Sequence, residues 1–286
     1  MPRVLIAGCG YVGRAIAELL HARGWEVEGW TSSSGSAEAF ASQPYEVRAV
    51  DLTDAGAVKR ASGDFDAIVH CASSRGGGPD AYRRVYLDGA RNLAAAMPAT
   101  LLLFTSSTSV YAQRGGEWVD ESSAAEPERE TGRILREAED CVLAQNGVVA
   151  RLAGIYGPGR SALLRKLLDR TAVIDPADRF LNQAHRDDIA SALVCLLEQS
   201  AITKGSIYNV TDNHPILQRD AYEWLARELG RAVPPISSAP VERKRGASNK
   251  RVSSRKLHEL GWQPRYPSFQ SAMRESILPS LSAFGA

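Results

Sequence analysis

The feature that most constrains the fold of this chain is the run RVLIAGCGYVG at residues 3–13. Residues 3–7 are apolar and too few for a helix, which is typical of a buried strand. Glycines at positions 8, 10 and 13 follow directly, and apolar residues then recur at helical spacing up to Gly24. A strand, a Gly-x-Gly-x-x-Gly turn and a helix in this order indicate a dinucleotide-binding unit.

Each glycine of this turn has a separate physical role. Gly8 permits the tight turn, Gly10 lets the backbone approach a pyrophosphate, and Gly13 lets the helix pack closely on the strand. The helix N-terminus, with Tyr11 and Val12, would offer free N–H groups and a positive dipole end to the phosphates. A glycine-rich turn that binds nothing is the alternative, but the strand directly before it and the helix directly after it favour nucleotide binding.

Composition excludes several classes of protein. A chain of 286 residues suits one large domain, or one domain with a smaller lobe. The 34 basic and 33 acidic side chains nearly cancel, so no global field favours nucleic acid or a membrane surface. No apolar run approaches the roughly 18 residues of a membrane helix, and the N-terminus lacks the pattern of a signal peptide. We therefore expect a cytoplasmic protein with neither nucleic-acid nor membrane partners.

The cysteines and the basic residues carry little functional signal. Cys9, Cys71, Cys141 and Cys195 form no Cys-x-x-Cys motif and have no histidine at ligand spacing. The sequence therefore predicts neither a metal site nor a disulfide framework. The basic run from Glu242 through Arg243, Lys244 and Arg245 to Lys250 and Arg251 is typical of a solvated loop. It could equally bind an anionic substrate.

Apolar strands alternate with helical segments through the first half of the chain. Beyond the first strand, further strands are predicted at 25–30, 46–50, 65–70, 101–104, 148–152 and 206–210, and long helices at 80–96 and 128–145. Strands that are apolar throughout indicate a parallel sheet covered by helices on both faces. The predicted fold class is α/β, with a Rossmann-type doubly wound parallel sheet.

The regular alternation ends after Leu152, which predicts a second unit. We expect a dinucleotide-binding Rossmann domain at residues 1–153, with its sheet completed by later segments near 181–212. Residues 154–180 and 213–286 would form a smaller, mainly helical C-terminal lobe on the substrate side. Helices are expected at 162–170, 185–199, 217–229, 254–260 and 268–282.

The motifs along the chain resemble those of the extended short-chain dehydrogenase/reductases, the NAD-dependent epimerase/dehydratase family. In chain order they are GxGxxG, DLTD, HCASS, SSTSVY, RLAGIYGPG, HRDDIA and SNKRVSSRKLHELGWQPRY. The resemblance runs essentially from end to end. Its most specific parts are SSTSVY and the later IYGPG.

The resemblance implies roles for residues at matching positions. Asp51 and Leu52 would line the adenine pocket, although Asp51 could merely start a turn. Ala72 and Ser73 would lie along the nicotinamide ribose. The loop that begins with Tyr156 and continues through Gly157 and Pro158 would lie beside the nicotinamide.

The resemblance also implies one catalytic residue, Ser107. It stands four residues before Tyr111, where the family keeps a Ser or Thr that hydrogen-bonds the reacting oxygen of the substrate. Ser107 could instead be one of several interchangeable loop hydroxyls. Asp187 or Asp188 is expected to be a helix N-cap rather than a catalyst, and His185, which opens the same helix, is expected to be structural.

The chain departs from the family at its proton-transfer pair. The family keeps Tyr-x-x-x-Lys on the long helix, whereas the matching positions here are Thr131 and Leu135. A tyrosine can transfer the proton because a neighbouring ammonium lowers its pKa from about 10 toward working pH. A threonine hydroxyl is too weak an acid for this role, and leucine carries no charge. The usual acid/base for alcohol–ketone hydride transfer is therefore missing.

Two smaller departures point to an atypical branch of the superfamily. Tyr86 stands where the family usually has Asn in an NxxGT run. The first turn is GxGxxG, whereas the family usually has GxxGxxG.

The end of the second strand bears on the choice of cofactor. An acidic residue there would bind the ribose 2′-OH and repel a 2′-phosphate. Here the position is Thr31, followed by Ser32 and two further serines. Hydroxyls can donate to a phosphate, and Arg14 follows the glycine turn closely enough to help. The sequence therefore favours NADP(H) over NAD(H).

Three functions remain open after these observations. The first is an NADP(H)-dependent oxidoreductase acting on an unidentified small molecule, with Tyr156, His185, water or the substrate replacing the missing proton donor. The second is a catalytically inactive NADP(H)-binding sensor or regulator. The third, less favoured because it needs the missing pair, is a nucleotide-sugar epimerase or dehydratase. A homodimer through the helix at 128–145, as in relatives, also remains open.

Overall fold

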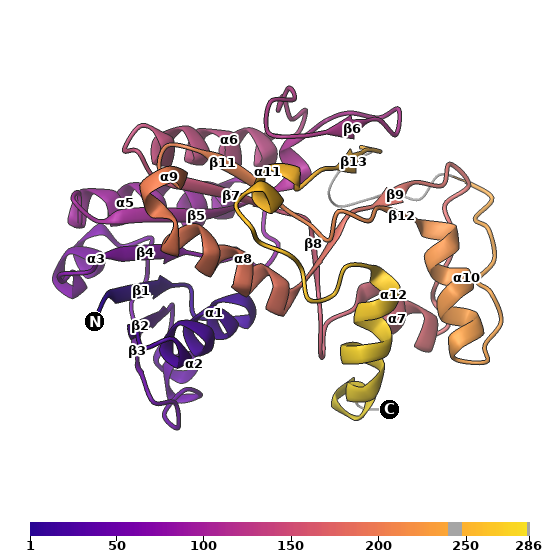
Figure 1. Ribbon diagram of the computed structural model, residues 1–286, viewed down its shortest axis with the longest axis horizontal. Coiled ribbons are helices and arrows are strands. Elements are labelled where there is room, and N and C mark those ends of the chain that lie inside the picture. Colours follow the sequence, from indigo (N-terminus) through magenta and orange to yellow (C-terminus); the bar gives the residue numbers. More distant parts are fainter. Residues whose placement is uncertain (240–247, 285–286) are drawn as a thin grey trace.

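A seven-stranded sheet forms the centre of the protein in the computed structural model, which describes residues 1–239 and 248–284 (Figure 1). Its strands are β1 (Arg3–Ala7), β2 (Glu26–Thr31), β3 (Glu46–Ala49), β4 (Ala67–His70), β5 (Leu101–Ser107), β7 (Val148–Leu152) and β11 (Ile207–Val210). They lie in the order β11-β7-β5-β4-β1-β2-β3, and all neighbouring pairs are parallel. This confirms the predicted α/β class with a Rossmann-type sheet. The strand order reverses between β1 and β4, where such sheets bind their ligands.

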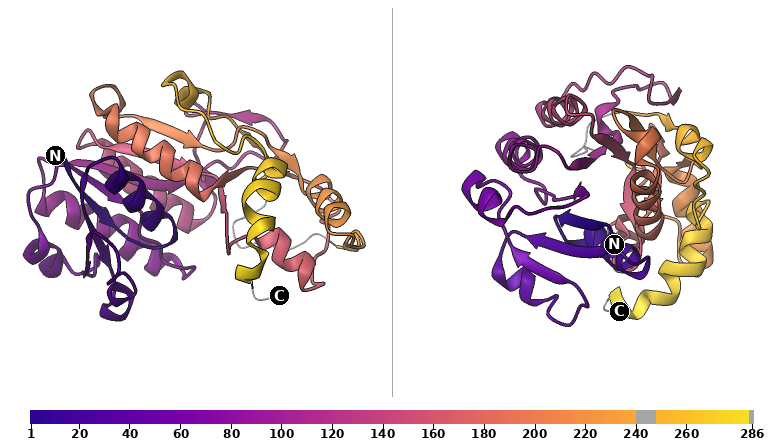
Figure 2. Two further views of the ribbon diagram at one scale, coloured as in Figure 1. Left: turned by 60° about the horizontal axis from the view of Figure 1, so that its bottom comes forward. Right: turned by 60° about the vertical axis from the view of Figure 1, so that its left-hand side comes forward.

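Helices cover both faces of this sheet, as Figure 2 shows. Alternate residues of β1 point to opposite faces: Val4 and Ile6 join one apolar cluster, and Leu5 and Ala7 join the other. The first cluster is completed by α1 (Tyr11–Ala22) and α8 (Arg186–Glu198), which pack against each other. The second is completed by α3 (Ala55–Ala61), α5 (Gly89–Ala96) and α6 (Glu130–Leu143). A short helix, α2 (Ser34–Glu38), follows β2.

The helix predicted at 80–96 is interrupted by a π-helical segment. It begins as α4 (Pro79–Tyr82), widens at η1 (Arg83–Asp88) and continues as α5. At the wide turn the Val85 carbonyl is 3.1 Å from Nε2 of His70, the last residue of β4. This contact ties the helix to the carboxyl edge of the sheet, and such an irregularity cannot be seen in an apolar spacing pattern.

A second unit lies beyond the carboxyl ends of the strands (Figure 1). Its apolar core is built mainly from α7 (Ala162–Leu168), α10 (Gln218–Glu228), and α12 (Phe269–Ala272) with its continuations η3 (Met273–Ile277) and η4 (Leu278–Phe284). The predicted division of the chain at residue 153 stays a prediction. The chain does return to the main sheet at β11.

Three short strand pairs were missed by the sequence analysis because each strand has only two or three residues. They are β10 (Gln183–His185) with β8 (Gly154–Tyr156), β12 (Ile216–Leu217) with β9 (Phe180–Leu181), and β13 (Arg251–Val252) with β6 (Trp118–Val119). The remaining short elements are η2 (Thr108–Val110), α9 (Ser200–Thr203) and α11 (Arg255–Glu259). The β6–β13 pair joins the loop after β5 to a segment near the C-terminus.

The sequence led to expectations about membrane-spanning helices and about the basic run near residue 245. Within the described ranges, no helix combines the length and apolar character needed to cross a bilayer. The basic residues 242–245 lie outside the described residues.

Candidate cofactor and active site

The three glycines of the turn after β1 differ in the space around them. Gly8 has a φ of +106°, and a Cβ added to it would be 2.2 Å from the amide nitrogen of Ala72. A Cβ on Gly13 would be 2.3 Å from the carbonyl oxygen of Gly8. By contrast, no heavy atom of the described residues outside its immediate neighbourhood lies within 4 Å of a Cβ position on Gly10. The backbone at Gly10 therefore faces open space.

The N-terminus of α1 is free to receive an anion. Gly10 is its N-cap residue, and the helix has no side-chain capping bond within the described structure. The first N–H groups of a helix have no intrahelical partner. Their dipoles add to the positive end of the helix, which suits a phosphate.

The end of β2 contains hydroxyl groups and no carboxylate. Thr31 is buried, and its Oγ1 donates to the carbonyl of Ser33 at 3.2 Å, whereas Ser32 is exposed. Arg14 is half-exposed, with its Nε 2.8 Å from Oε1 of Glu18. Arg14 would therefore have to exchange Glu18 for a ligand phosphate.

The residues predicted around the adenine and ribose follow β3 and β4. Asp51 is exposed, and its Oδ1 accepts a bond of 2.9 Å from the Thr53 amide, so this carboxylate does shape a turn. Leu52 is buried in the second apolar cluster. Ala72 lies against Gly8, and the exposed Ser73 accepts a bond from the amide of Arg75 at 3.2 Å. The loops after β1 and β4 therefore meet at the point where the strand order reverses.

Ser107 ends β5 and caps the short turn η2. Its Oγ accepts a bond of 3.2 Å from the amide of Ser109. Within the described part of the chain this hydroxyl donates to no acceptor, so its proton is available to a substrate oxygen. Tyr111 turns away into the core, where its hydroxyl donates to Oδ1 of Asn209 at 3.0 Å.

A buried ion pair behind Ser107 was not predicted. Glu139 on α6 is completely buried, and its Oε2 is 2.7 Å from Nη2 of Arg151 on β7. Ser106 donates to Oε1 at 2.5 Å, and Arg136 also contacts this carboxylate. The arrangement joins β5, α6 and β7. The sequence signal was an arginine inside an otherwise apolar strand, VVARL.

Apolar packing surrounds one of the two positions at which the resemblance implied an acid/base pair. Leu135 is 4% exposed and belongs to the apolar cluster that includes Val110 and Tyr111. Helix α6 packs on β5, which ends at Ser107, and on η2, which follows it. Thr131 is only partly buried. Tyr86 stands where the family usually has Asn. Its ring centroid lies 4.9 Å from that of Tyr82 and 6.4 Å from that of Phe104.

The loop after β8 contacts the start of α1. The Tyr11 hydroxyl donates to the carbonyl of Pro158 at 2.9 Å, and the guanidinium groups of Arg160 and Arg186 lie over the Tyr11 ring. Gly157 has a φ of +155°, and a Cβ there would be 2.6 Å from the Tyr11 hydroxyl. The Tyr156 ring points into the core of the second unit.

Neither side chain suggested as a substitute proton donor is exposed. Burial raises the pKa of Tyr156 well above 10, and burial lowers the pKa of His185 to about 4. His185 Nδ1 accepts from the amide of Asp187, so His185 itself is the N-cap of α8. The expectation that Asp187 or Asp188 caps this helix was wrong. Asp188 instead accepts bonds from the amides of Arg265 and Tyr266, at 2.7 and 3.1 Å.

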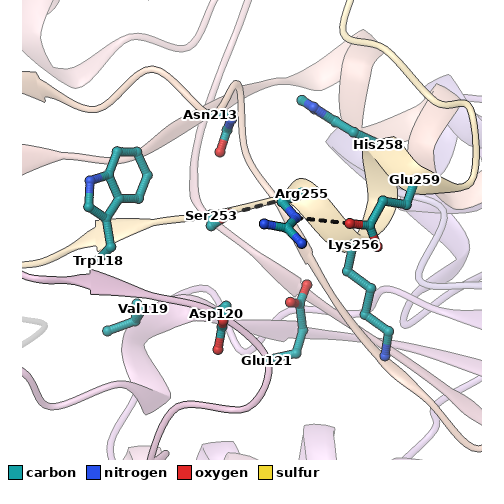
Figure 3. A pocket seen from close by; sticks show the side chains of 10 residues that line it. All are labelled: Trp118, Val119, Asp120, Glu121, Asn213, Ser253, Arg255, Lys256, His258 and Glu259. Atoms are coloured by element: carbon teal, nitrogen blue, oxygen red, sulfur yellow. Dashed lines mark hydrogen bonds and ion pairs between the residues drawn. The ribbon is translucent and has the colours of Figure 1, made fainter.

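A separate cavity of about 570 Å³ opens beside the β6–β13 pair (Figure 3). Its lining residues are Trp118, Val119, Asp120, Glu121, Asn213, Ser253, Arg255, Lys256, His258 and Glu259. None of them is a predicted site residue. Across both described ranges, no three His, Cys, Asp or Glu side chains are grouped as a metal site would require.

The sheet order and the glycine turn at its switch point define a Rossmann-type dinucleotide-binding fold. More specifically, the chain belongs to the NAD-dependent epimerase/dehydratase family, whose family model matches residues 4–211.

Comparisons with known proteins agree with this family. Protein YeeZ of Escherichia coli K12 is 32% identical over 282 residues, which cover 93% of this chain and 97% of that protein. A Methylobacillus flagellatus structure assigned to the NAD-dependent epimerase/dehydratases is 29% identical, with a TM-score of 0.80 and coverage of 98% and 99% of the two chains. Thermus thermophilus UDP-glucose 4-epimerase in complex with NAD has a TM-score of 0.81 at 22% identity, covering 100% and 99%, and shares the fold.

Proposed function

We propose that this protein binds a nicotinamide dinucleotide, NADP(H) in preference to NAD(H), and transfers hydride between it and a small molecule. The observation that carries the proposal is the open space at Gly10, beside an uncapped helix N-terminus and the switch point of the sheet. A side chain at Gly10 would enter this space, which suits a backbone that must approach a pyrophosphate. The family description, NAD-dependent epimerase/dehydratase, supports the same cofactor class.

The residues present fit such a cofactor from one end to the other. The pyrophosphate would lie on Gly8, Gly10, Tyr11, Val12 and Gly13. The adenosine end would lie near Arg14, Thr31, Ser32, Asp51 and Leu52, and the nicotinamide end near Ala72, Ser73 and the Tyr156 loop. When bound, the nicotinamide would donate or accept the hydride.

Ser107 is the proposed catalytic residue of this chain. Its free O–H would donate to the reacting oxygen of a substrate and orient it. Since Thr131 and Leu135 supply no acid, and Tyr156 and His185 are buried, the substrate should need little acid assistance. An activated double bond or a reactive aldehyde would meet this condition.

The preference for NADP(H) rests on the end of β2. Thr31 and Ser32 carry no negative charge that would repel a 2′-phosphate, and Arg14 lies on the first turn of the neighbouring helix. An arginine matches the geometry of a phosphate group.

Two other functions have their own supporting observations. The missing acid/base pair favours a cofactor-loaded sensor without chemistry. A partner protein whose affinity changes with the NADP⁺/NADPH ratio would identify this function.

The fold shared with a UDP-glucose 4-epimerase favours nucleotide-sugar chemistry. An isomer or dehydration product from a nucleotide sugar would establish that activity, which would have to proceed without the usual Tyr and Lys.

The deciding experiment is a titration of the purified protein with NADPH and, separately, with NADH, followed by nicotinamide fluorescence. We expect saturable binding of both and tighter binding of NADPH. A screen of aldehydes, quinones and activated alkenes with the preferred cofactor then tests hydride transfer. Absence of binding for both cofactors would overturn the proposal, and binding without turnover would favour the sensor.

A further inference from the structure

Lys250 is a buried ammonium group whose hydrogen-bond partners are neutral. The residue is 6% exposed, and Nζ donates to the Tyr111 carbonyl and to Ser248 Oγ, both at 2.9 Å. An ammonium has three donors, so one remains. No carboxylate of the described residues forms an ion pair with it. A buried cation without a counter-ion costs free energy, and proteins seldom keep one without a use for it.

A second cation, Arg179, is partly buried, and one of its nitrogens lacks a hydrogen-bond partner among the described residues. Its Nε is buried and has no hydrogen-bond partner within residues 1–239 and 248–284. The nearest acid in sequence, Asp178, accepts from the backbone amide of Arg179, and its other oxygen faces Arg219 at 3.8 Å. The guanidinium of Arg179 therefore has no paired carboxylate among the described residues.

The two cations lie on chain segments that run side by side. The amide of Phe180, next to Arg179, donates to Asn249 Oδ1 at 3.0 Å, and Asn182 donates to the Lys250 carbonyl at 2.9 Å. Burial and, to a smaller extent, the charge of Arg179 lower the pKa of Lys250 to about 8, whereas the exposed Glu117 acts in the opposite direction. Two like charges brought together in this way would each be stabilised by an anion.

This pair of cations is close to the proposed catalytic serine. The carbonyl that receives Lys250 belongs to Tyr111, four residues after Ser107 and directly after the turn η2. Four residues span at most about 14 Å even when extended, and this turn is compact. The Cα atoms of Ser107 and of Tyr111, whose carbonyl Lys250 contacts, are therefore no more than about 14 Å apart.

We propose that Lys250 and Arg179 bind an anionic group, a carboxylate or a phosphate, of the substrate that presents its reacting oxygen to Ser107. This inference rests on the proposed function, because it assigns a substrate class to that site. The planar guanidinium can bind two oxygens of such a group, while the ammonium supplies its remaining proton. Lys250 and Arg179 would thereby select anionic substrates over neutral ones.

The test measures anion binding to the full-length protein without cofactor. Melting temperatures are recorded against increasing inorganic phosphate and, separately, acetate, at constant ionic strength maintained with chloride. We expect at least one of the two anions to raise the melting temperature of the wild type, and the more effective anion identifies the group. Lys250→Met and Arg179→Met should each weaken this effect about tenfold or more in apparent Kd, as expected when a charged hydrogen bond is lost.

Two controls distinguish this site from others. Arg255→Met removes an exposed cation from the same segment and should respond like the wild type. Phosphate bound at the turn after β1 would stabilise the Lys250→Met variant as much as the wild type. If Lys250 were only structural, Lys250→Met would lower the melting temperature without anion; we expect it to stay level or rise, because a buried unpaired charge is removed.

The outcomes separate this inference from the proposed function. A wild type that no anion stabilises, or an anion effect unchanged in both variants, overturns the site even if NADPH binds. Anion binding that depends on Lys250 and Arg179 in a protein that binds neither NADPH nor NADH supports the anion site and overturns the proposed function instead.

Discussion

Gly8 and Ala72 approach so closely that a Cβ on the glycine would be 2.2 Å from the alanine amide nitrogen. This contact joins the loop after β1 to the loop after β4. Gly8 also has a φ of +106°, a backbone conformation that glycine adopts readily and residues with a Cβ rarely do.

The contact predicts opposite outcomes for two glycine substitutions in one turn. Gly8→Ala should lower the free energy of unfolding by about 3 kcal/mol or more, since it combines a steric clash with a strained φ. Gly10→Ala should leave stability nearly unchanged and weaken nicotinamide binding, because its Cβ would enter the space proposed for the pyrophosphate. Urea denaturation and NADPH titration of both variants provide the measurements. An equal loss of stability in Gly8→Ala and Gly10→Ala would contradict the different roles proposed for these glycines.

Arg14→Ala should reduce the preference for NADPH over NADH. The guanidinium is proposed to exchange Glu18 for the 2′-phosphate, and its loss should raise the Kd for NADPH about tenfold while leaving NADH nearly unchanged. Glu18→Gln is the matched variant, and it should strengthen NADPH binding by releasing Arg14. An unchanged ratio of the two Kd values in Arg14→Ala would contradict the role of Arg14.

The buried pair of Glu139 and Arg151 should be costly to break. Glu139→Ala should destabilise the protein by about 3–5 kcal/mol, because it leaves the Arg151 guanidinium buried without its carboxylate. Glu137→Ala on the same helix is the control. It removes an exposed ion pair with Arg83 and should cost less than about 1 kcal/mol. The urea denaturation midpoints of the two variants are the measurement. Similar midpoints would contradict the stabilising role of the buried Glu139–Arg151 pair.

Restoring a lysine at position 135 should damage the fold. Leu135 is 4% exposed and packs in the apolar cluster on α6. Leu135→Lys should cost about 2 kcal/mol or more, since it would bury an ammonium without a partner. Leu135→Met, of similar volume, should cost less than about 1.5 kcal/mol. Thermal melting of both variants is the measurement, and an unperturbed Leu135→Lys protein would show that this site can open to solvent.

Asp212→Asn should change how stability depends on pH. Burial raises the pKa of Asp212 from 3.8 to about 7, and its Oδ2 has no partner among the described residues. The folded protein thus retains a proton that the unfolded chain loses above pH 4, so this group makes stability fall as pH rises from 4 to 7. Asparagine has no proton to lose.

The variant should therefore gain stability relative to the wild type, by about 2–3 kcal/mol between pH 5 and pH 7.5. Urea denaturation at both pH values measures this difference. Effects of His70 and His185, whose pKa values burial lowers to about 4, are present in both proteins and cancel. A difference that does not vary with pH would contradict the assignment.

Much of the fold could be predicted because its signals are local. The main strands lie within about three residues of the ranges expected from apolar runs, and the longer helices lie where apolar spacing predicts them, whereas the short α2, α3 and α9 were not predicted. The π-helical turn at Arg83–Asp88 and the two-residue strands could not be predicted in this way. Their stability comes from contacts with distant residues, such as the Val85 carbonyl with His70.

By itself, the sequence determined the parallel α/β sheet, the glycine turn after its first strand and the departure from the Tyr-x-x-x-Lys pair. Each of these features depends on the residue types within one short segment, such as the glycines of the turn or the apolar residues of a strand. Only the tertiary structure decided that Tyr156 and His185 are buried, that Glu139 pairs with Arg151, and that Lys250 reaches the Tyr111 carbonyl. Burial and charge pairing depend on which distant segments meet, and Lys250 and Tyr111 are 139 residues apart in the chain.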